Sequence, residues 1–186
     1  MGETTSNNSG EGGTSPRDTG EDPGLSTYLN DHLAGSAGAL QLAKRLREEH
    51  GPSDLGRYLA DLVAEIEEDR GVLQRVMLKV GAKANPVKQA GALGAEFLTR
   101  LKHHVSVISS GSAVARLEEV EILSLGIAGK QLLWRLLGEL ADSDERLQEF
   151  DFSALTERAE VQRDGLEPFR TELGTLAFSA ESRPPS

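Results

Sequence analysis

The sequence predicts an all-α protein, a four-helix bundle made of two antiparallel hairpins. Apolar residues recur at spacings of three, four and seven over four long stretches, which is the period of an amphipathic helix. Glycine, proline and serine residues punctuate the chain between these stretches. No stretch alternates apolar and polar residues as a half-buried strand does, so strands are not expected.

The first two helices are expected to form the first hairpin. One covers about residues 26–49 and stops at Gly51 and Pro52. The next begins after Ser53, a favourable N-cap residue, and runs to about residue 80, where Gly81 provides a C-terminal signal. The short link between them requires an antiparallel arrangement.

The second hairpin is expected from helices over about residues 113–141 and 152–178. The connection between the two hairpins is much longer and carries a shorter helical pattern over about residues 86–103. A short helix in a long crossover is therefore predicted.

Both ends of the chain differ in composition from the bundle. Residues 1–24 are mostly small, polar and acidic, and residues 181–186 contain two adjacent prolines. Such segments bury too little apolar surface to offset the entropy lost on ordering, so disordered tails are expected on either side of a domain over residues 25–180.

Charge and composition exclude several functions. The formal net charge is −10, with 30 acidic against 20 basic residues, which disfavours binding to nucleic acid or to anionic membrane surfaces. The absence of cysteine excludes disulfides and thiolate metal sites. With no apolar N-terminal stretch and no run long enough to span a membrane, a cytoplasmic protein is expected.

Four stretches carry a resemblance to known proteins: YLNDHLAGSAGALQLAKRL (28–46), EIEEDRGVLQ (65–74), LEEVEILSLGIAGKQLLWRLL (117–137) and RAEVQRDGLEPFR (158–170). They are similar to segments of uncharacterised actinobacterial proteins of the ferritin-like, four-helix-bundle kind. The resemblance covers roughly residues 25–178. It implies a ferritin-like connectivity, but it implies no activity.

The ligand set of a ferritin-like di-metal site is incomplete in this sequence. Such a site takes one Glu from each of two helices and a Glu-x-x-His pair from each of the other two. Here Glu67 and Glu160 are followed at that spacing by Arg70 and Arg163, and a guanidinium has no lone pair to offer a metal. The third helix has no acid between residues 122 and 138. We therefore expect no metal and no other cofactor.

Polar residues interrupt the apolar stripes of three helices. One interpretation is a satisfied interior polar layer that fixes the register of the helices; the other is a site, or the remnant of one, for a polar ligand. We favour the first, and because buried charges are tolerated only when paired, we expect the acids and arginines to be mutual partners. The layer is predicted to consist of Asp69, Arg70, Glu121, Glu160, Gln162 and Arg163.

Small residues gather at two places, over residues 35–38 and residues 126–129. We expect them to let two helices approach closely; the alternative is a cavity that would accept an apolar ligand.

The function expected from the sequence is non-catalytic. No phosphate-binding loop and no GxSxG motif occurs. Apolar residues in LLWRLLGEL (132–140) cover more than one helix face, which indicates self-association, most simply as a homodimer, or an unknown protein partner, with Trp134 in the core or at the contact. One alternative is a ferritin-like metalloprotein, a di-iron or manganese oxidase or store with an atypical ligand set. Another is a small-molecule binder with its site in a bundle cavity.

Overall fold

The computed structural model describes residues 22–84 and 112–179, which form four long α-helices and one short 3₁₀ helix. This confirms the all-helical prediction, and the described residues contain no strand. The predicted helix over residues 86–103 and the C-terminal tail lie outside the described residues, as does the N-terminal tail up to residue 21. The elements are α1 (Pro23–His50), α2 (Asp54–Val80), α5 (Ala113–Ala141), η1 (Glu145–Leu147) and α6 (Phe152–Phe178).

Helix α1 begins earlier than the sequence predicted. The side chain of Asp22 accepts hydrogen bonds from the backbone N–H groups of Gly24 and Leu25, at 2.8 and 3.1 Å, and Pro23 occupies the first turn. Asp22 is thus an N-cap, and proline is well tolerated at that end of a helix. The assignment of Pro23 and Gly24 to the disordered tail was therefore wrong.

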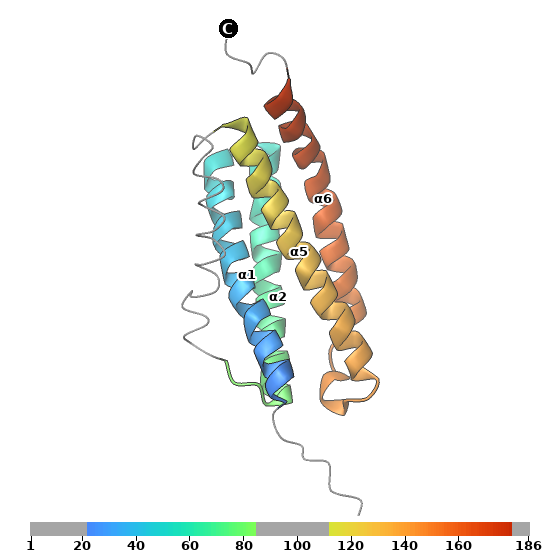
Figure 1. The fold of residues 1–186 in the computed structure, drawn as a ribbon. Helices are drawn as coiled ribbons and strands as arrows, with labels where there is room; N and C mark the ends of the chain where they lie inside the picture. The colour runs from blue at the N-terminus through green and yellow to red at the C-terminus, as the bar shows by residue number, and fades with distance from the viewer. Residues whose placement is uncertain (1–21, 85–111, 180–186) are drawn as a thin grey trace, which may run out of the picture.

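The turn between α1 and α2 depends on two glycines. Gly51 has φ +52°, in the left-handed region, and ends α1. A Cβ atom at Gly56 would lie 2.0 Å from the carbonyl oxygen of Gly51, so no side chain fits there. The two helices run antiparallel through this tight turn (Figure 1).

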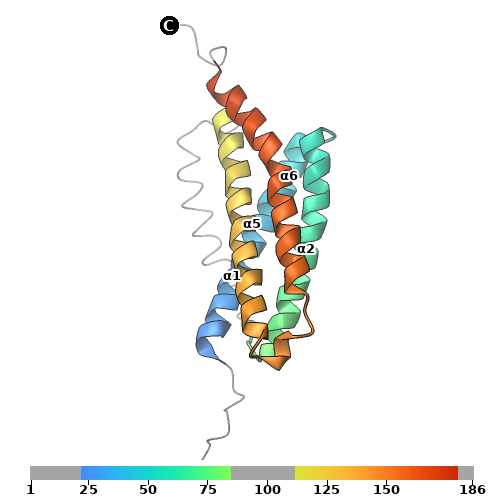
Figure 2. The same cartoon turned by 90° about the vertical axis from the view of Figure 1, so that its right-hand side faces the viewer.

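Helices α5 and α6 form the second antiparallel hairpin, with η1 in the link. Ser112 caps α5 and Asp151 caps α6, each through a hydrogen bond to a backbone N–H in the first turn. Helix α2 ends at one end of the bundle and α5 begins at the other, as two views show (Figures 1 and 2). Helices α2 and α5 therefore run in the same direction.

The core of the bundle is divided into two apolar clusters along its length. On α2, one cluster ends at Ile66 and the other begins at Leu73; on α5, the same division falls between Ile127 and Leu133. Each hairpin is packed closely within itself, whereas α1 and α5 meet at few points. Two features lie at the level where the clusters separate: a buried ion network and a pocket.

Candidate functional site

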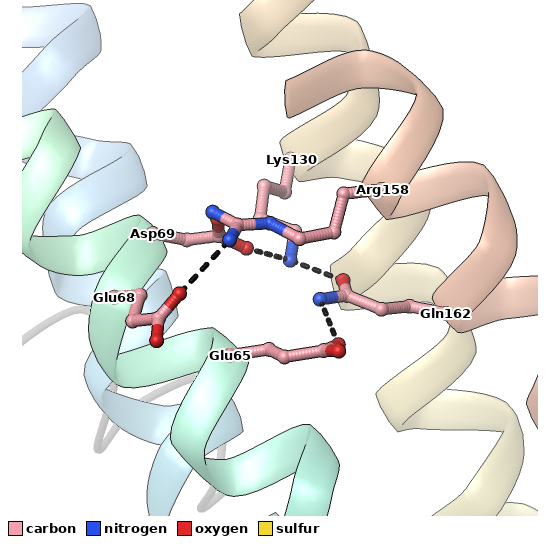
Figure 3. Close-up of polar contacts among 6 residues, drawn as sticks. All are labelled: Glu65, Glu68, Asp69, Lys130, Arg158 and Gln162. Carbon is pink, nitrogen blue, oxygen red and sulfur yellow. Dashed lines mark hydrogen bonds and ion pairs between the residues drawn. The ribbon is translucent and has the colours of Figure 1, made fainter. Parts of the chain in front are cut away.

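The buried ion network is centred on the carboxylate of Asp69 in α2 (Figure 3). Asp69 is only 3% exposed. One of its oxygens pairs with the ammonium group of Lys130 from α5, and the other pairs with the guanidinium of Arg158 from α6. A buried carboxylate needs such partners, because its charge loses the stabilisation of water.

The remaining partners extend this network across three helices. Lys130 also donates to the Oε1 atom of Gln162, and the Nε2 atom of Gln162 donates to Glu65 at 2.7 Å. Arg158 forms a second ion pair, with Glu68, at 3.0 Å. Burial lowers the pKa of Lys130, and the nearby carboxylate of Asp69 opposes that shift. The network joins α2 of the first hairpin to both helices of the second.

The structure places the six residues of the predicted polar layer in three different environments. Asp69 and Gln162 are buried and share Lys130. Glu121 is half-buried, 3.4 Å from Arg170. Arg70 is half-buried too, but it lies on the pocket wall away from Asp69's ion pairs.

Glu160 and Arg163 are exposed, so the prediction that they belong to an interior polar layer was wrong. On α6 the inward positions are those of Arg158 and Gln162, four residues apart on one face. Residues two positions before and one position after Gln162 point well away from that face, since successive residues are about 100° apart. The expected partners, Arg70 and Arg163, are accordingly replaced by Lys130 and Arg158 at Asp69 and by Arg170 at Glu121.

Two residues of the buried network, Lys130 and Arg158, were not predicted from the sequence, although one carried a visible signal. Lys130 is the single charged residue between Glu121 and Arg135, in an otherwise apolar stretch of helix. A lone charge in such a stretch indicates a buried partner. Arg158 gave a weaker signal, because it lies only one turn before Gln162 on α6.

A pocket of about 720 Å³ lies beside the network, between α1, α2 and α5. Most of its wall is apolar and comes from both core clusters, so the pocket spans the level at which they separate. The larger apolar lining residues are Leu42, Ile66, Leu73, Ile122, Leu125, Ile127, Leu133 and Trp134. The polar ones are Asp31, His32, Ser36, Asp69, Arg70 and Lys130.

Small residues on α1 and α5 leave this space open. A Cβ atom at Gly35 or at Gly129 would meet no described atom of a neighbouring element within 4 Å. At Gly126 the two helices come close, because a Cβ atom there would lie 3.8 Å from the Cβ of Ala39. The expected close approach thus holds at Gly126, whereas the cavity, which was the alternative interpretation, fits the open space at Gly35 and Gly129.

Arg70 contributes a positive charge to the pocket wall. Its Nη1 atom donates to the carbonyl oxygen of Leu33 at 3.1 Å and to the hydroxyl of Ser36 at 2.6 Å, both neutral acceptors. Glu67, one turn earlier on α2, is exposed and forms its ion pair with Lys44 at 2.6 Å. Burial lowers the pKa of Arg70, while the charge of Glu67 acts in the opposite direction. A guanidinium stays protonated under these conditions.

Trp134 lies in the core, which was one of the two locations expected for it, and not at an exposed contact surface. It is 1% exposed, and its ring stacks on Phe152 with a centroid distance of 6.2 Å. Its indole N–H is buried and has no hydrogen-bond acceptor among the described residues. The pocket is therefore bordered by a buried donor that the described protein does not satisfy.

His32 forms part of the pocket wall on α1. Its ring meets that of Tyr28 edge to face, with the centroids 4.6 Å apart. Burial lowers the pKa of His32 below 6.5, and the neighbouring charge of Asp31 offsets part of this shift. The imidazole is thus neutral at neutral pH.

Within residues 22–84 and 112–179, no three His, Cys, Asp or Glu side chains are grouped in a way that would hold a metal ion. Glu67 and Glu160, the acids of the two Glu-x-x-Arg pairs, are both exposed. Of the helices in these ranges, none has the length and apolar content that crossing a bilayer requires.

Comparison of the chain with protein-family models, with curated proteins and with solved structures gives no match.

Proposed function

We propose that this protein is a non-catalytic binding bundle that holds a small, largely apolar molecule between α1, α2 and α5. The observation that carries the proposal is the pocket of about 720 Å³ with a mainly apolar wall and few polar groups. Small-molecule sites in proteins are typically about 300–1,000 Å³ and have this kind of lining. Bundle interiors between helices are a common place for them.

The composition of the wall supports a binding role. Empty space in a protein interior lowers stability, because the atoms around it lose contacts. Each glycine within a helix costs about 1 kcal/mol relative to alanine. Gly35, Gly38, Gly126 and Gly129 all line this pocket, with Gly35 and Gly126 exposed where it opens to solvent, so the glycine cost and the packing cost fall in the same place. A bound molecule would restore the contacts.

The charged groups beside the pocket support a non-catalytic role. Both oxygens of Asp69 are engaged, by Lys130 and Arg158, and Lys130 is held by Gln162 as well. A general base or a nucleophilic amine needs an atom that can reach a substrate. These side chains instead hold one another.

The proposal is tested by titrating the protein with 1-decanol in a calorimeter. Gly129→Leu fills the pocket without a clash at Cβ, so it should abolish binding while the helix remains folded. The matched control is Gly71→Leu, another helical glycine, with only the end of Arg75 near its Cβ position, at 3.9 Å, and outside the pocket. Equal binding by the wild type and by Gly129→Leu would refute the pocket as the site.

A second candidate function is self-association through α5, as the sequence suggested. Leu125, Leu132 and Leu136 are 70%, 62% and 38% exposed, and their spacing of seven and four places them on one side of the helix. Exposed apolar surface of this kind favours a contact with a second subunit.

We also propose that the bundle has ferritin-like connectivity and that the protein is cytoplasmic. The parallel direction of α2 and α5 supports the first part, because two hairpins joined by one long crossover have this arrangement. A metalloprotein remains the less favoured alternative, since arginines stand where a di-metal site takes histidines.

A further inference from the structure

We infer that the ligand of this pocket is an amphiphilic monoanion, with an apolar body against the small-residue wall and a carboxylate head bound by Arg70. The inference rests on the proposed function and specifies the chemical class of the ligand. It follows from the balance of charges and of hydrogen-bonding groups in the pocket wall.

Among the described residues of the pocket wall, Arg70 is the charged group with no opposite charge in contact with it. Its acceptors are a carbonyl and a hydroxyl oxygen, and these use one of its three nitrogen atoms. Glu67, one turn earlier on the same helix, is paired with Lys44 on the exposed surface. A half-buried guanidinium with only neutral acceptors is a favourable place for a carboxylate, which it binds through two parallel hydrogen bonds.

The other titratable groups of the pocket do not supply that charge. Asp69 and Lys130 are paired with each other, and Arg158 adds a further positive charge to the same carboxylate. His32 is neutral at neutral pH because burial lowers its pKa. Asp31 is exposed, at the rim on α1. The interior of the pocket therefore keeps the charge of Arg70.

The hydrogen-bonding groups of the wall show the same imbalance. The buried indole N–H of Trp134 has no acceptor among the described residues, and it borders the same pocket as Arg70. Both unsatisfied features are donors. A carboxylate contributes two oxygens that only accept, whereas an amine would add further donors. The wall thus selects an anionic head over a cationic one.

The rest of the wall fits an apolar chain. Gly35 and Gly129 leave open space beside α1 and α5, and Ile66 and Leu73 of α2 line the same pocket. An apolar body in this space is removed from water at the level between the two core clusters. The combination defines an amphiphile rather than a free small anion.

The experiment compares decanoate with 1-decanol at neutral pH, using calorimetry and the fluorescence of Trp134, which is the single tryptophan of the chain. A neutral apolar pocket prefers the alcohol, because burying an unpaired carboxylate is costly. With Arg70 in the wall, decanoate should bind more tightly than decanol and should change the tryptophan emission. Acetate should not compete with decanoate, because it lacks the apolar body.

Arg70→Met removes the charge at similar side-chain length, and it should weaken decanoate about tenfold to a hundredfold, as expected for the loss of a charge-assisted hydrogen bond. Its effect on decanol should be small. The control is Arg75→Met, an exposed arginine on the same helix and outside the pocket, which should leave both affinities unchanged. If Arg70→Met does not fold, the anionic head is tested with Arg70→Lys instead, together with the comparison of decanoate and decanol on the wild type.

Three outcomes separate the two proposals. Preference for decanoate that is lost in Arg70→Met supports the inference. If decanol binds as tightly as decanoate, or if Arg70→Met affects both alike, the anionic head is refuted while the binding function stands. If neither compound binds the wild type, both proposals are overturned together.

Discussion

Asp69 links the two hairpins through buried ion pairs. Its carboxylate is 3% exposed and holds Lys130 and Arg158. Asp69→Asn keeps the shape but leaves two cations without their anion, one of them largely buried. We expect a loss of about 3–5 kcal/mol in the free energy of unfolding, measured by urea denaturation.

Glu68→Gln is the matched control for this measurement. Glu68 also pairs with Arg158, but its side chain is 67% exposed, and exposed pairs contribute little. The change should cost no more than about 0.5 kcal/mol. If Asp69→Asn were as mild as Glu68→Gln, the buried network would not be what holds α2 against α5 and α6.

His32 gives the stability of the protein a specific dependence on pH. Its pKa in the folded state is lowered below 6.5, first by burial, so below that pH the unfolded chain takes up a proton that the folded chain resists. The unfolded state then binds more protons, and stability falls as the pH falls through this window. His32→Gln should lose less stability than the wild type between neutral pH and about pH 5.5, measured by urea denaturation at each pH. Identical losses in both proteins would contradict the lowered pKa.

The sequence predicted part of the candidate site at the level of single residues. Asp69 and Gln162 were identifiable because each interrupts an apolar stripe. Their partners were not, because whether Lys130 or Arg70 reaches Asp69 depends on how α2 and α5 are rotated about their axes. Packing between the hairpins sets that rotation, so it cannot be predicted from the spacing of residues within one helix.

The contact between α2 and α6 is set by a glycine. A Cβ atom at Gly165 would lie 2.7 Å from Cε2 and Oη of Tyr58, whose hydroxyl donates to the carbonyl oxygen of Gln162. Gly165→Ala should therefore lower the melting temperature, with a cost of about 1–3 kcal/mol for overpacking, although alanine is the better helix former.

Gly71→Ala is the comparison for this prediction, because only the flexible end of Arg75 lies near, at 3.9 Å. Here the better helix propensity of alanine should raise stability, by up to about 1 kcal/mol. Stabilisation of both variants to the same extent would mean that Tyr58 moves freely and that α2 and α6 are not in close contact at this point.

The helices themselves were the most predictable part of the molecule. The ends of α2, at Ser53 and Gly81, were identified because capping residues act locally. The start of α1 was predicted too late, since the polar composition of residues 1–24 favoured a tail that included Asp22 and Pro23. Local signals of capping and turn formation thus outweighed the polar composition.

The molecule as a whole is predicted to self-associate through α5. Leu132→Lys places a charge in the exposed leucine row and should convert the dimer into a monomer, measured by light scattering at micromolar concentration. Leu78→Lys is the control, because Leu78 is 79% exposed on α2 and outside this row. A monomeric wild type across the whole concentration range would refute the dimer.

The sequence predicted the pocket only as the less favoured of two alternatives for its small residues. Small residues permit either close approach or a cavity, and the outcome depends on the separation of α1 and α5. These two helices belong to different hairpins and meet at few points. Their separation is a property of the whole bundle, so no local pattern in the sequence predicts it.

The most direct test of the proposed binding function is a crystal structure of the full chain grown with 1-decanol. We expect density for the alcohol between α1, α2 and α5, along Gly35 and Gly129, with its hydroxyl towards Arg70. Side chains of the protein filling that space, or decanol bound only elsewhere, would contradict the binding function proposed for this bundle.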